Sequence, residues 1–85
     1  MSMKVPIRLP ELGIEPVVFS HWYAKLGERV AKGERVAEVI GPSTTFDVPA
    51  TRDGVLIEQC TQPNDDLVTG QMLGIIDTSL SNDEM

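Results

Sequence analysis

Short apolar runs recur along this chain, and several of them alternate apolar with polar residues. Alternation with a period of two is typical of β-strands, whereas an amphipathic helix needs a period near 3.6 over about ten residues or more. No stretch of the sequence shows such a helical period, and Gly, Pro, Asn or Asp bound most of the runs. The pattern predicts eight strands, at residues 3–9, 16–23, 29–31, 35–40, 45–49, 54–60, 66–68 and 72–77.

The strand pattern occurs twice, because residues 27–40 align with residues 64–77. The matching pairs are Val30 and Leu67, Gly33 and Gly70, Val36 and Leu73, and Val39 and Ile76. One such unit is too small to bury an apolar face by itself, so two units must pack together. The repeat predicts an all-β fold, a flattened barrel or sandwich with quasi-twofold symmetry.

We expect the core to be filled by apolar residues of the predicted strands. These are Val5, Ile7, Val18, Trp22, Val30, Val36, Val39, Val48, Val55, Ile57, Leu67, Leu73 and Ile76. Eighty-five residues allow one small domain, which we place at residues 1–78. Residues 79–85 are polar and acidic, and they predict a flexible tail.

The charge of the chain limits its partners. The net charge is −6, and residues 53–85 contain seven acids and no base. Nucleic-acid binding depends on neutralising phosphates with Lys and Arg, so this balance argues against it and permits docking onto basic protein surfaces. The sequence contains no apolar run of about 18 residues and does not begin like a signal peptide. We therefore expect a cytoplasmic, monomeric domain without membrane contact.

Residues that could carry out catalysis are few. Cys60 and His21 are the single cysteine and histidine, and neither stands at a spacing from Ser20 or an acid that indicates a nucleophile with its base. We expect Cys60 to be a buried or half-buried apolar residue. Asp65 and Asp66 match turn positions of the repeat and so predict solvated turn residues. The sequence predicts no catalytic residue, no metal site and no enzyme activity.

The most informative segment is residues 38–50, which predicts a β-hairpin. Val39 and Ile40 precede Gly41-Pro42-Ser43, while Phe46 and Val48 follow it at a period of two. Proline suits the second position of a type I turn. We expect an exposed tip at Pro42-Ser43.

A series of spaced residues surrounds this hairpin. They are Gly27-Glu28-Arg29-Val30, Gly33, Val36, Glu38-Val39, Val48-Pro49-Ala50 and Asp53-Gly54. In this pattern the chain resembles the lipoyl/biotinyl domain family over residues 3–77, most of all the lipoyl domains of 2-oxo acid dehydrogenase acyltransferase (E2) components. The resemblance implies two four-stranded antiparallel sheets, with the hairpin at one end and the chain termini near the other. It also implies a lysine on the tip that carries lipoate or biotin.

The attachment lysine of the resemblance is missing. Counting back from Val48-Pro49-Ala50 places Ser43 at the position of the modified lysine, and Pro42 and Thr44 replace its usual Asp and Ala neighbours. Because a hydroxyl cannot form the stable amide of lipoate or biotin, we expect a degenerate attachment turn and no cofactor. The resemblance then implies a protein-interaction or structural module, with dehydrogenase-complex enzymes as partners.

An alternative is a working lipoyl or acyl-group carrier with a shifted attachment site. The remaining lysines are Lys4, Lys25 and Lys32, and none falls on the predicted tip. Ser43 also matches poorly with a phosphopantetheine carrier, which presents its serine at the start of a helix. The sequence favours the module without a cofactor.

Overall fold

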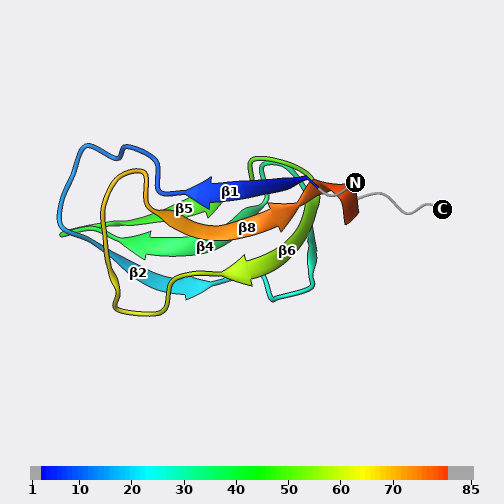
Figure 1. The fold of residues 1–85 in the computed structure, drawn as a ribbon. Helices are drawn as coiled ribbons and strands as arrows, with labels where there is room; N and C mark the ends of the chain where they lie inside the picture. Colours follow the sequence, from blue (N-terminus) through cyan, green and yellow to red (C-terminus); the bar gives the residue numbers. More distant parts are fainter. Residues whose placement is uncertain (1–2, 81–85) are drawn as a thin grey trace.

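The computed structural model describes residues 3–80 and consists of eight β-strands and one short 3₁₀ helix (Figure 1). The strands are β1 (Lys4–Arg8), β2 (Val17–Trp22), β3 (Arg29–Val30), β4 (Arg35–Ile40), β5 (Thr45–Pro49), β6 (Gly54–Gln59), β7 (Asp66–Leu67) and β8 (Met72–Asp77). Every predicted strand is present, and each boundary agrees to within one residue. The alternating pattern was therefore a sufficient guide to the strands.

The strands form two four-stranded antiparallel sheets. One has the order β1-β8-β6-β3, and the other has the order β5-β4-β2-β7. The orders correspond under the internal repeat, because β6 and β8 occupy in one sheet the places of β2 and β4 in the other. This arrangement confirms the predicted all-β fold of two packed units.

The repeat extends to the hydrogen bonds of its turns. The Lys25 N–H donates to Glu28 Oε1 at 2.8 Å, and the Gln62 N–H donates to Asp65 Oδ2 at 2.9 Å. The turn that follows repeats as well, with bonds from Ala31 N–H to Glu34 Oε1 at 2.9 Å and from Val68 N–H to Gln71 Oε1 at 3.0 Å. The two units thus share the same turn chemistry, with a carboxylate or amide oxygen as acceptor.

The core lies between the sheets and confirms much of the expected set. Buried positions among those predicted are Ile7, Val30, Val36, Val39, Val48, Leu67, Leu73 and Ile76. The prediction was wrong for the inward faces of β2 and β6. Val17 and Phe19 are buried on β2 and Leu56 is buried on β6, whereas Val18, Val55 and Ile57 are only half-buried. Each strand contains three consecutive apolar residues, so the period of two does not identify which of them face inward.

Two further expected core residues, Val5 and Trp22, are half-buried. Trp22 packs against Phe19 with ring centroids 5.3 Å apart, and its indole N–H donates to the carbonyl of Thr61 at 3.2 Å. Under the repeat Trp22 corresponds to Gln59, whose amide donates to the carbonyl of Ala24 at 3.0 Å. These equivalent bonds each join a strand of one sheet to a segment that leaves the other sheet.

The end of the chain differs from the expected tail at its first residues. Ser79 and Leu80 belong to the 3₁₀ helix η1 (Thr78–Leu80), and the rest of the expected tail lies outside the described residues. The Ser79 hydroxyl and N–H donate to Asp77 Oδ1 at 2.6 and 3.0 Å. The hydroxyl bond is the main reason that the pKa of Asp77 lies below its usual value.

Candidate functional site

The hairpin predicted from the sequence is present, formed by β4 and β5. Ile40 pairs with Thr45, so residues 41–44 form the loop between the strands. The Gly41 N–H donates to the carbonyl of Thr44 at 2.8 Å. This bond runs in the opposite sense to the bond of a type I turn, which the N–H of the fourth residue donates to the first carbonyl. The bond that closes the loop thus differs from the usual bond of a type I turn, and the turn type at Pro42 stays a prediction.

The tip itself is exposed at Pro42, Ser43 and Thr44. Within the described residues the Ser43 hydroxyl has no hydrogen-bond partner, while the Thr44 hydroxyl donates to the carbonyl of Thr45 at 3.3 Å. Ser43 is therefore accessible to a large partner, but its side chain offers only a neutral hydroxyl.

The three lysines lie away from this tip. In Figure 1, β1 and β4 run toward the hairpin end, so Lys4 and the connections that contain Lys25 and Lys32 lie at the opposite end. The N–H of Lys32 donates to Asp53 Oδ1 at 2.7 Å, which ties its turn to the start of β6. The loop at the hairpin tip consists of Gly41, Pro42, Ser43 and Thr44, and the lysines lie at the other end of the fold.

The connection between β1 and β2 also forms part of the hairpin end. Gly41 is buried because Ile14 packs directly against it, and a β-carbon added to Gly41 would overlap the Ile14 side chain. Leu12, from the same connection, packs against the core. The sequence identified Gly41 only as a turn residue, and it contained no signal that the distant Ile14 would cover it.

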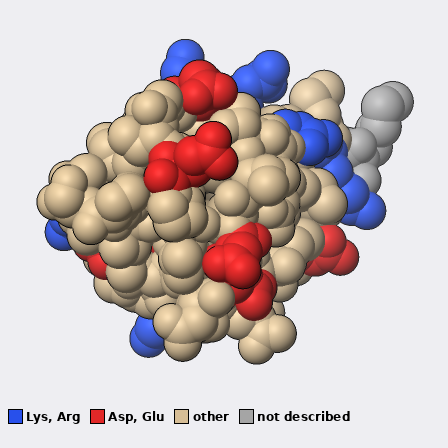
Figure 2. All heavy atoms as spheres, turned by 90° about the vertical axis from the view of Figure 1, so that its left-hand side faces the viewer, with Lys and Arg blue, Asp and Glu red and all other residues tan. Residues whose placement is uncertain are grey.

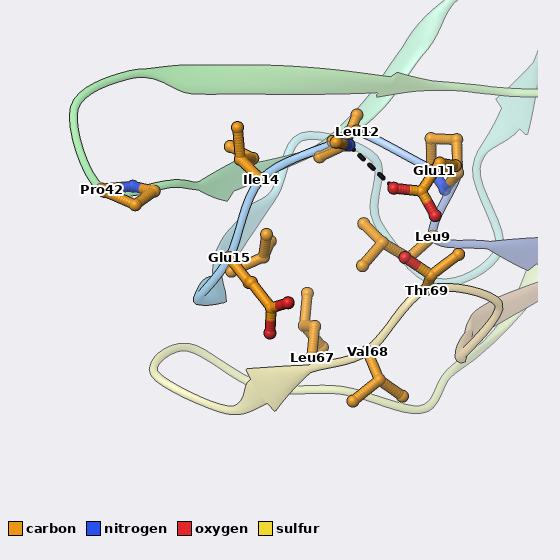
Figure 3. Close-up of a pocket in the computed structure, with 12 residues that line it drawn as sticks. Leu9, Glu11, Leu12, Ile14, Glu15, Pro42, Leu67, Val68 and Thr69 are labelled. Atoms are coloured by element: carbon orange, nitrogen blue, oxygen red, sulfur yellow. Dashed lines mark hydrogen bonds between the residues drawn. The ribbon is translucent and has the colours of Figure 1, made fainter.

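A groove of about 800 Å³ lies beside the tip (Figure 3). Residues 9–15 and Val17 form one side of it, Pro42 belongs to the hairpin tip, and residues 67–69 at the end of β7 form the other side. Sequence reasoning missed this groove, because its walls are far apart along the chain and meet only in the packed fold.

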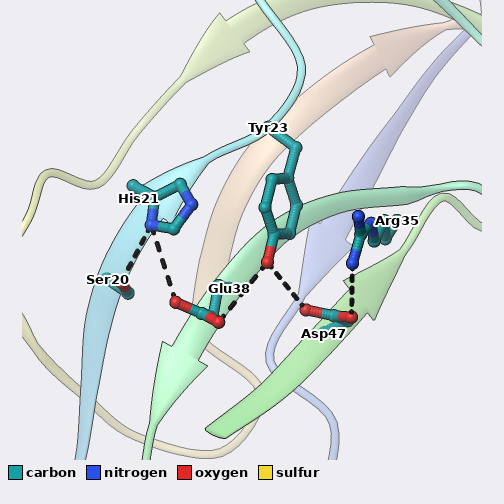
Figure 4. Close-up of polar contacts among 6 residues, drawn as sticks. All are labelled: Ser20, His21, Tyr23, Arg35, Glu38 and Asp47. Atoms are coloured by element: carbon teal, nitrogen blue, oxygen red, sulfur yellow. Dashed lines mark hydrogen bonds and ion pairs between the residues drawn. The ribbon is translucent and has the colours of Figure 1, made fainter.

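A polar network covers the outer face of β2, β4 and β5 (Figure 4). The Tyr23 hydroxyl lies 3.1 Å from Asp47 Oδ1 and 3.4 Å from Glu38 Oε2, and Arg35 lies 3.4 Å from Asp47. Partial desolvation and the bond to Asp47 raise the pKa of Tyr23. Tyr23 directly follows β2, whereas Glu38 lies on β4 and Asp47 on β5, so the network ties the hairpin to the rest of its sheet.

His21 belongs to this network but lacks the geometry of a catalytic relay. Its Nδ1 lies 2.9 Å from the Ser20 hydroxyl and 3.6 Å from Glu38 Oε1. A triad places the nucleophile and the acid on different ring nitrogens, whereas here both approach the same one. The arrangement can order side chains on the sheet, and it does not activate Ser20.

The other residues considered from the sequence lie apart. Asp65 accepts bonds from the Thr61 hydroxyl at 3.1 Å and from the Gln62 N–H at 2.9 Å, in agreement with its expected turn role. The described part of the chain contains no group of three His, Cys, Asp or Glu side chains placed to hold a metal. Over the same residues, no helix is long and apolar enough to span a membrane.

Cys60 corrects another expectation, because it is exposed and not buried. β6 ends at Gln59, and the Cys60 N–H donates to the carbonyl of Leu73 at 2.7 Å. The backbone is thus held in the fold while the side chain faces solvent. Partial desolvation and the neighbouring Glu58 raise the pKa of the thiol, which makes it less reactive than a free cysteine.

A family model of biotin/lipoyl domains, described as "Biotin-requiring enzyme", matches residues 5–76. The chain belongs to this biotin/lipoyl family. The resemblance found in the strand and turn residues is thereby confirmed.

Two similar proteins carry the same description, the dihydrolipoyllysine-residue succinyltransferase component of the 2-oxoglutarate dehydrogenase complex. The Haemophilus influenzae protein is 31% identical over 83 residues, which are 95% of this chain and 20% of that protein. The Bartonella vinsonii subsp. berkhoffii protein is 29% identical over 82 residues, which are 94% of this chain and 20% of that protein. This biotin/lipoyl domain therefore spans about one fifth of the length of these curated relatives.

A solved structure gives the same relationship. The lipoyl domain of the 2-oxoglutarate dehydrogenase complex from Azotobacter vinelandii superposes with a TM-score of 0.61 at 28% sequence identity. The match covers 89% of this chain and 94% of the other. The biotin/lipoyl domain described here is thus related to the lipoyl domains of E2 components, in fold as well as in sequence.

Proposed function

We propose that this chain is a lipoyl domain that carries no lipoate and acts as a protein-interaction or structural module of a 2-oxo acid dehydrogenase complex. One observation supports it above all: Ser43 lies exposed at the hairpin tip, while every lysine lies at the opposite end. The similar proteins from Haemophilus and Bartonella are named as components of such a complex, which supports the choice of partner.

The chemistry of attachment supports the absence of the cofactor. A swinging group needs a stable bond to a long side chain that reaches several active sites, and the lysine amide provides both. Ser43 provides neither the amine nor the length. Because Pro42 and Thr44 also replace the usual neighbours, the change covers three consecutive residues of the loop. We infer that the domain has no catalytic activity and uses its surface for protein contacts.

The remaining structure supports a domain that is kept intact for such contacts. The hairpin is closed by its own hydrogen bond, covered by Ile14 and joined to β2 by the Tyr23 network. A dehydrogenase-complex enzyme is the proposed partner, and the isolated domain is proposed to be a cytoplasmic monomer.

The test is the intact mass of the chain after coexpression with a lipoate ligase and excess lipoate. We expect the mass of the unmodified chain. The H. influenzae lipoyl domain, expressed alongside, verifies that the ligase is active. A gain of one lipoyl group on this chain would contradict the proposal and would support the alternative of a carrier with a shifted site. Peptide mapping of the modified residue would then locate that site.

A further inference from the structure

The outer faces of the two sheets correspond position by position, because the internal repeat relates the sheets. The register of β2 against β4 shifts between Phe19 and His21, and that of β6 against β8 shifts between Leu56 and Glu58. These shifts fall at equivalent places of the repeat, which aligns residues 27–40 with residues 64–77. Each residue on one outer face therefore has a counterpart on the other, and the two faces can be compared directly.

The polar network on the β5 sheet (β5-β4-β2-β7) corresponds to apolar residues on the β1 sheet (β1-β8-β6-β3). The equivalent pairs, network residue first, are Glu38 and Ile75, Asp47 and Pro6, Arg35 and Met72, and Ser20 and Ile57. The other network residues, His21 and Tyr23, correspond to Glu58 and Cys60. Polar side chains are usual on the solvated face of an antiparallel sheet. Their replacement by apolar ones indicates a face that a partner covers.

These apolar side chains, which we call the apolar patch, keep part of their surface accessible. Ile75 faces outward, because Ile76 beside it is fully buried. It pairs with Pro6 on β1 and lies opposite the register shift that contains Ile57 on β6. Pro6, Ile57 and Ile75 are half-buried, and Met72 is exposed. A partner on this face would therefore remove apolar surface from water.

Basic residues lie at both edges of the same face. Lys4 and Arg8 are exposed on β1 and stand four residues apart, so they share one face of the strand. At the other edge Arg29 on β3 is exposed beside buried Val30. The Arg8 guanidinium donates to the carbonyl of Gly70 at 2.9 Å, which holds it in place and leaves its charge uncompensated by that bond. The apolar patch thus lies between basic edges.

The charges of the two sheets differ in sign. The strands of the β1 sheet contain three bases and two acids, Glu58 and Asp77. The strands of the β5 sheet contain one base and three acids. The hairpin end is also acidic, with acidic side chains over the middle of its face and basic ones at its margin (Figure 2). On a chain of net charge −6, the β1 sheet is therefore the face that favours an acidic partner.

We propose that the outer face of the β1 sheet binds a segment of a partner protein in which apolar side chains are flanked by Asp or Glu. The apolar side chains lie on the apolar patch, and the carboxylates lie against Lys4 and Arg8. These two positions are about 13 Å apart, at roughly 3.3 Å per residue of a strand, so they match acids four residues apart in an extended segment. The inference rests on the proposed function as a protein-interaction module and adds the contact surface and the chemistry of the partner. A second copy is disfavoured, because two chains of net charge −6 repel each other.

The experiment uses the full chain, labelled with ¹⁵N, and two peptides. One peptide has Leu and Ile between two Glu residues four positions apart, and its matched control has Lys in place of each Glu. We expect the acidic peptide to shift the amide signals of residues 4–8, 55–58 and 72–76 and to leave those of residues 35–47 unchanged. Because the net charge of the chain favours the basic control, a preference for the acidic peptide requires a local basic surface.

Two matched pairs of variants locate the contact. Ile75→Thr and Lys4→Gln are each expected to weaken binding about fivefold, the loss of one apolar or charge-assisted contact. The controls are Ile40→Thr, an exposed apolar position of the other sheet, and Lys32→Gln, in the connection between β3 and β4. Both controls should change the dissociation constant by less than about twofold. Amide spectra verify that each variant is folded, and Met72→Gln replaces Ile75→Thr if the latter does not fold.

Intact mass is recorded first, so that a lipoylated sample, which contradicts the proposed function, is distinguished from a failure of this surface alone. An absence of shifts at millimolar acidic peptide, or equal shifts with both peptides, would overturn the inference. Effects of the control variants equal to those of Ile75→Thr and Lys4→Gln would do the same. Concentration-dependent shifts at residues 4–8 and 72–76 without peptide would assign the face to a second copy. Shifts of these residues on deletion of residues 81–85, again without peptide, would assign it to the end of the chain itself.

Discussion

Ile14 packs directly against Gly41, at the point where a β-carbon on residue 41 would lie. The contact joins the connection between β1 and β2 to the hairpin tip, two segments that are well separated along the chain. The position of the tip therefore depends on a glycine that leaves room for a side chain from another part of the fold.

Gly41→Ala is expected to destabilise the chain by about 0.5–1.5 kcal/mol, because the overlap falls on the terminal Cδ1 of the partly exposed Ile14, which can turn aside at the cost of a strained rotamer. Ile14→Ala removes the overlap, so the double variant should lose less stability than the sum of the two single variants. The measurement is urea unfolding followed by Trp22 fluorescence. Ser43→Ala, on the exposed tip, serves as the control and should change stability by less than about 0.5 kcal/mol. If the losses of stability of Gly41→Ala and Ile14→Ala add in the double variant, the contact between these two residues does not contribute to the stability of the chain.

Restoring the attachment loop should restore modification. We expect the triple variant Pro42→Asp, Ser43→Lys and Thr44→Ala to gain one lipoyl group from a lipoate ligase, because the tip then presents an amine with its usual neighbours on an intact hairpin. Ser43→Lys alone should be modified to a smaller extent. Intact mass measures both. If neither variant is modified, the recognition surface for the ligase has changed beyond the loop.

The inward faces of β2 and β6 can be tested by truncation. Phe19→Ala is expected to cost about 3–5 kcal/mol and Leu56→Ala about 2–5 kcal/mol, because both side chains are fully buried. Val18→Ala and Val55→Ala, on the half-buried faces of the same strands, should cost clearly less. Urea unfolding gives the comparison, and thermal unfolding covers any variant that is too unstable at 25 °C. Equal costs for the two faces would contradict the placement of the core.

The stability of the chain is expected to depend on the ionisation of Asp77. Hydrogen bonds from Ser79 lower the pKa of this carboxyl in the folded state, because they stabilise its ionised form. The unfolded chain lacks this stabilisation. The stability from this group is present above the unfolded pKa of about 3.9 and is lost as the pH falls through the lower folded pKa.

Ser79→Ala removes the hydroxyl bond and should raise the pKa of Asp77 toward its ordinary value. An NMR titration of the Asp77 carboxyl carbon measures this change directly, and urea unfolding below pH 4 should show a smaller loss of stability on acidification. Thr44→Ala, which removes an unrelated exposed hydroxyl, is the control. An unchanged Asp77 titration in Ser79→Ala would show that another group sets its pKa.

The sequence determined the strands and the family because both depend on local features. Alternation of apolar and polar residues marks a strand wherever it occurs, and Gly33, Gly70 and Asp53-Gly54 mark turns that need particular residues. The internal repeat then required two units to share a core. The absence of lysine from the tip also followed from the sequence, because a hairpin places its own loop at its end.

Tertiary structure decided the features that depend on distant contacts. Val17-Val18-Phe19 and Val55-Leu56-Ile57 are apolar throughout, so only the packing of the sheets selects Phe19 and Leu56 for the core. Cys60 is exposed, as are Glu58 and Gln59 before it, and the register of β6 against β8 shifts between Leu56 and Glu58. The groove between residues 9–15 and residues 67–69 arises where two connections meet, and local pattern contains no information about such a meeting. The sequence by itself therefore determined which strands and which hairpin form, whereas long-range packing decided which faces are buried and which surface the hairpin end offers.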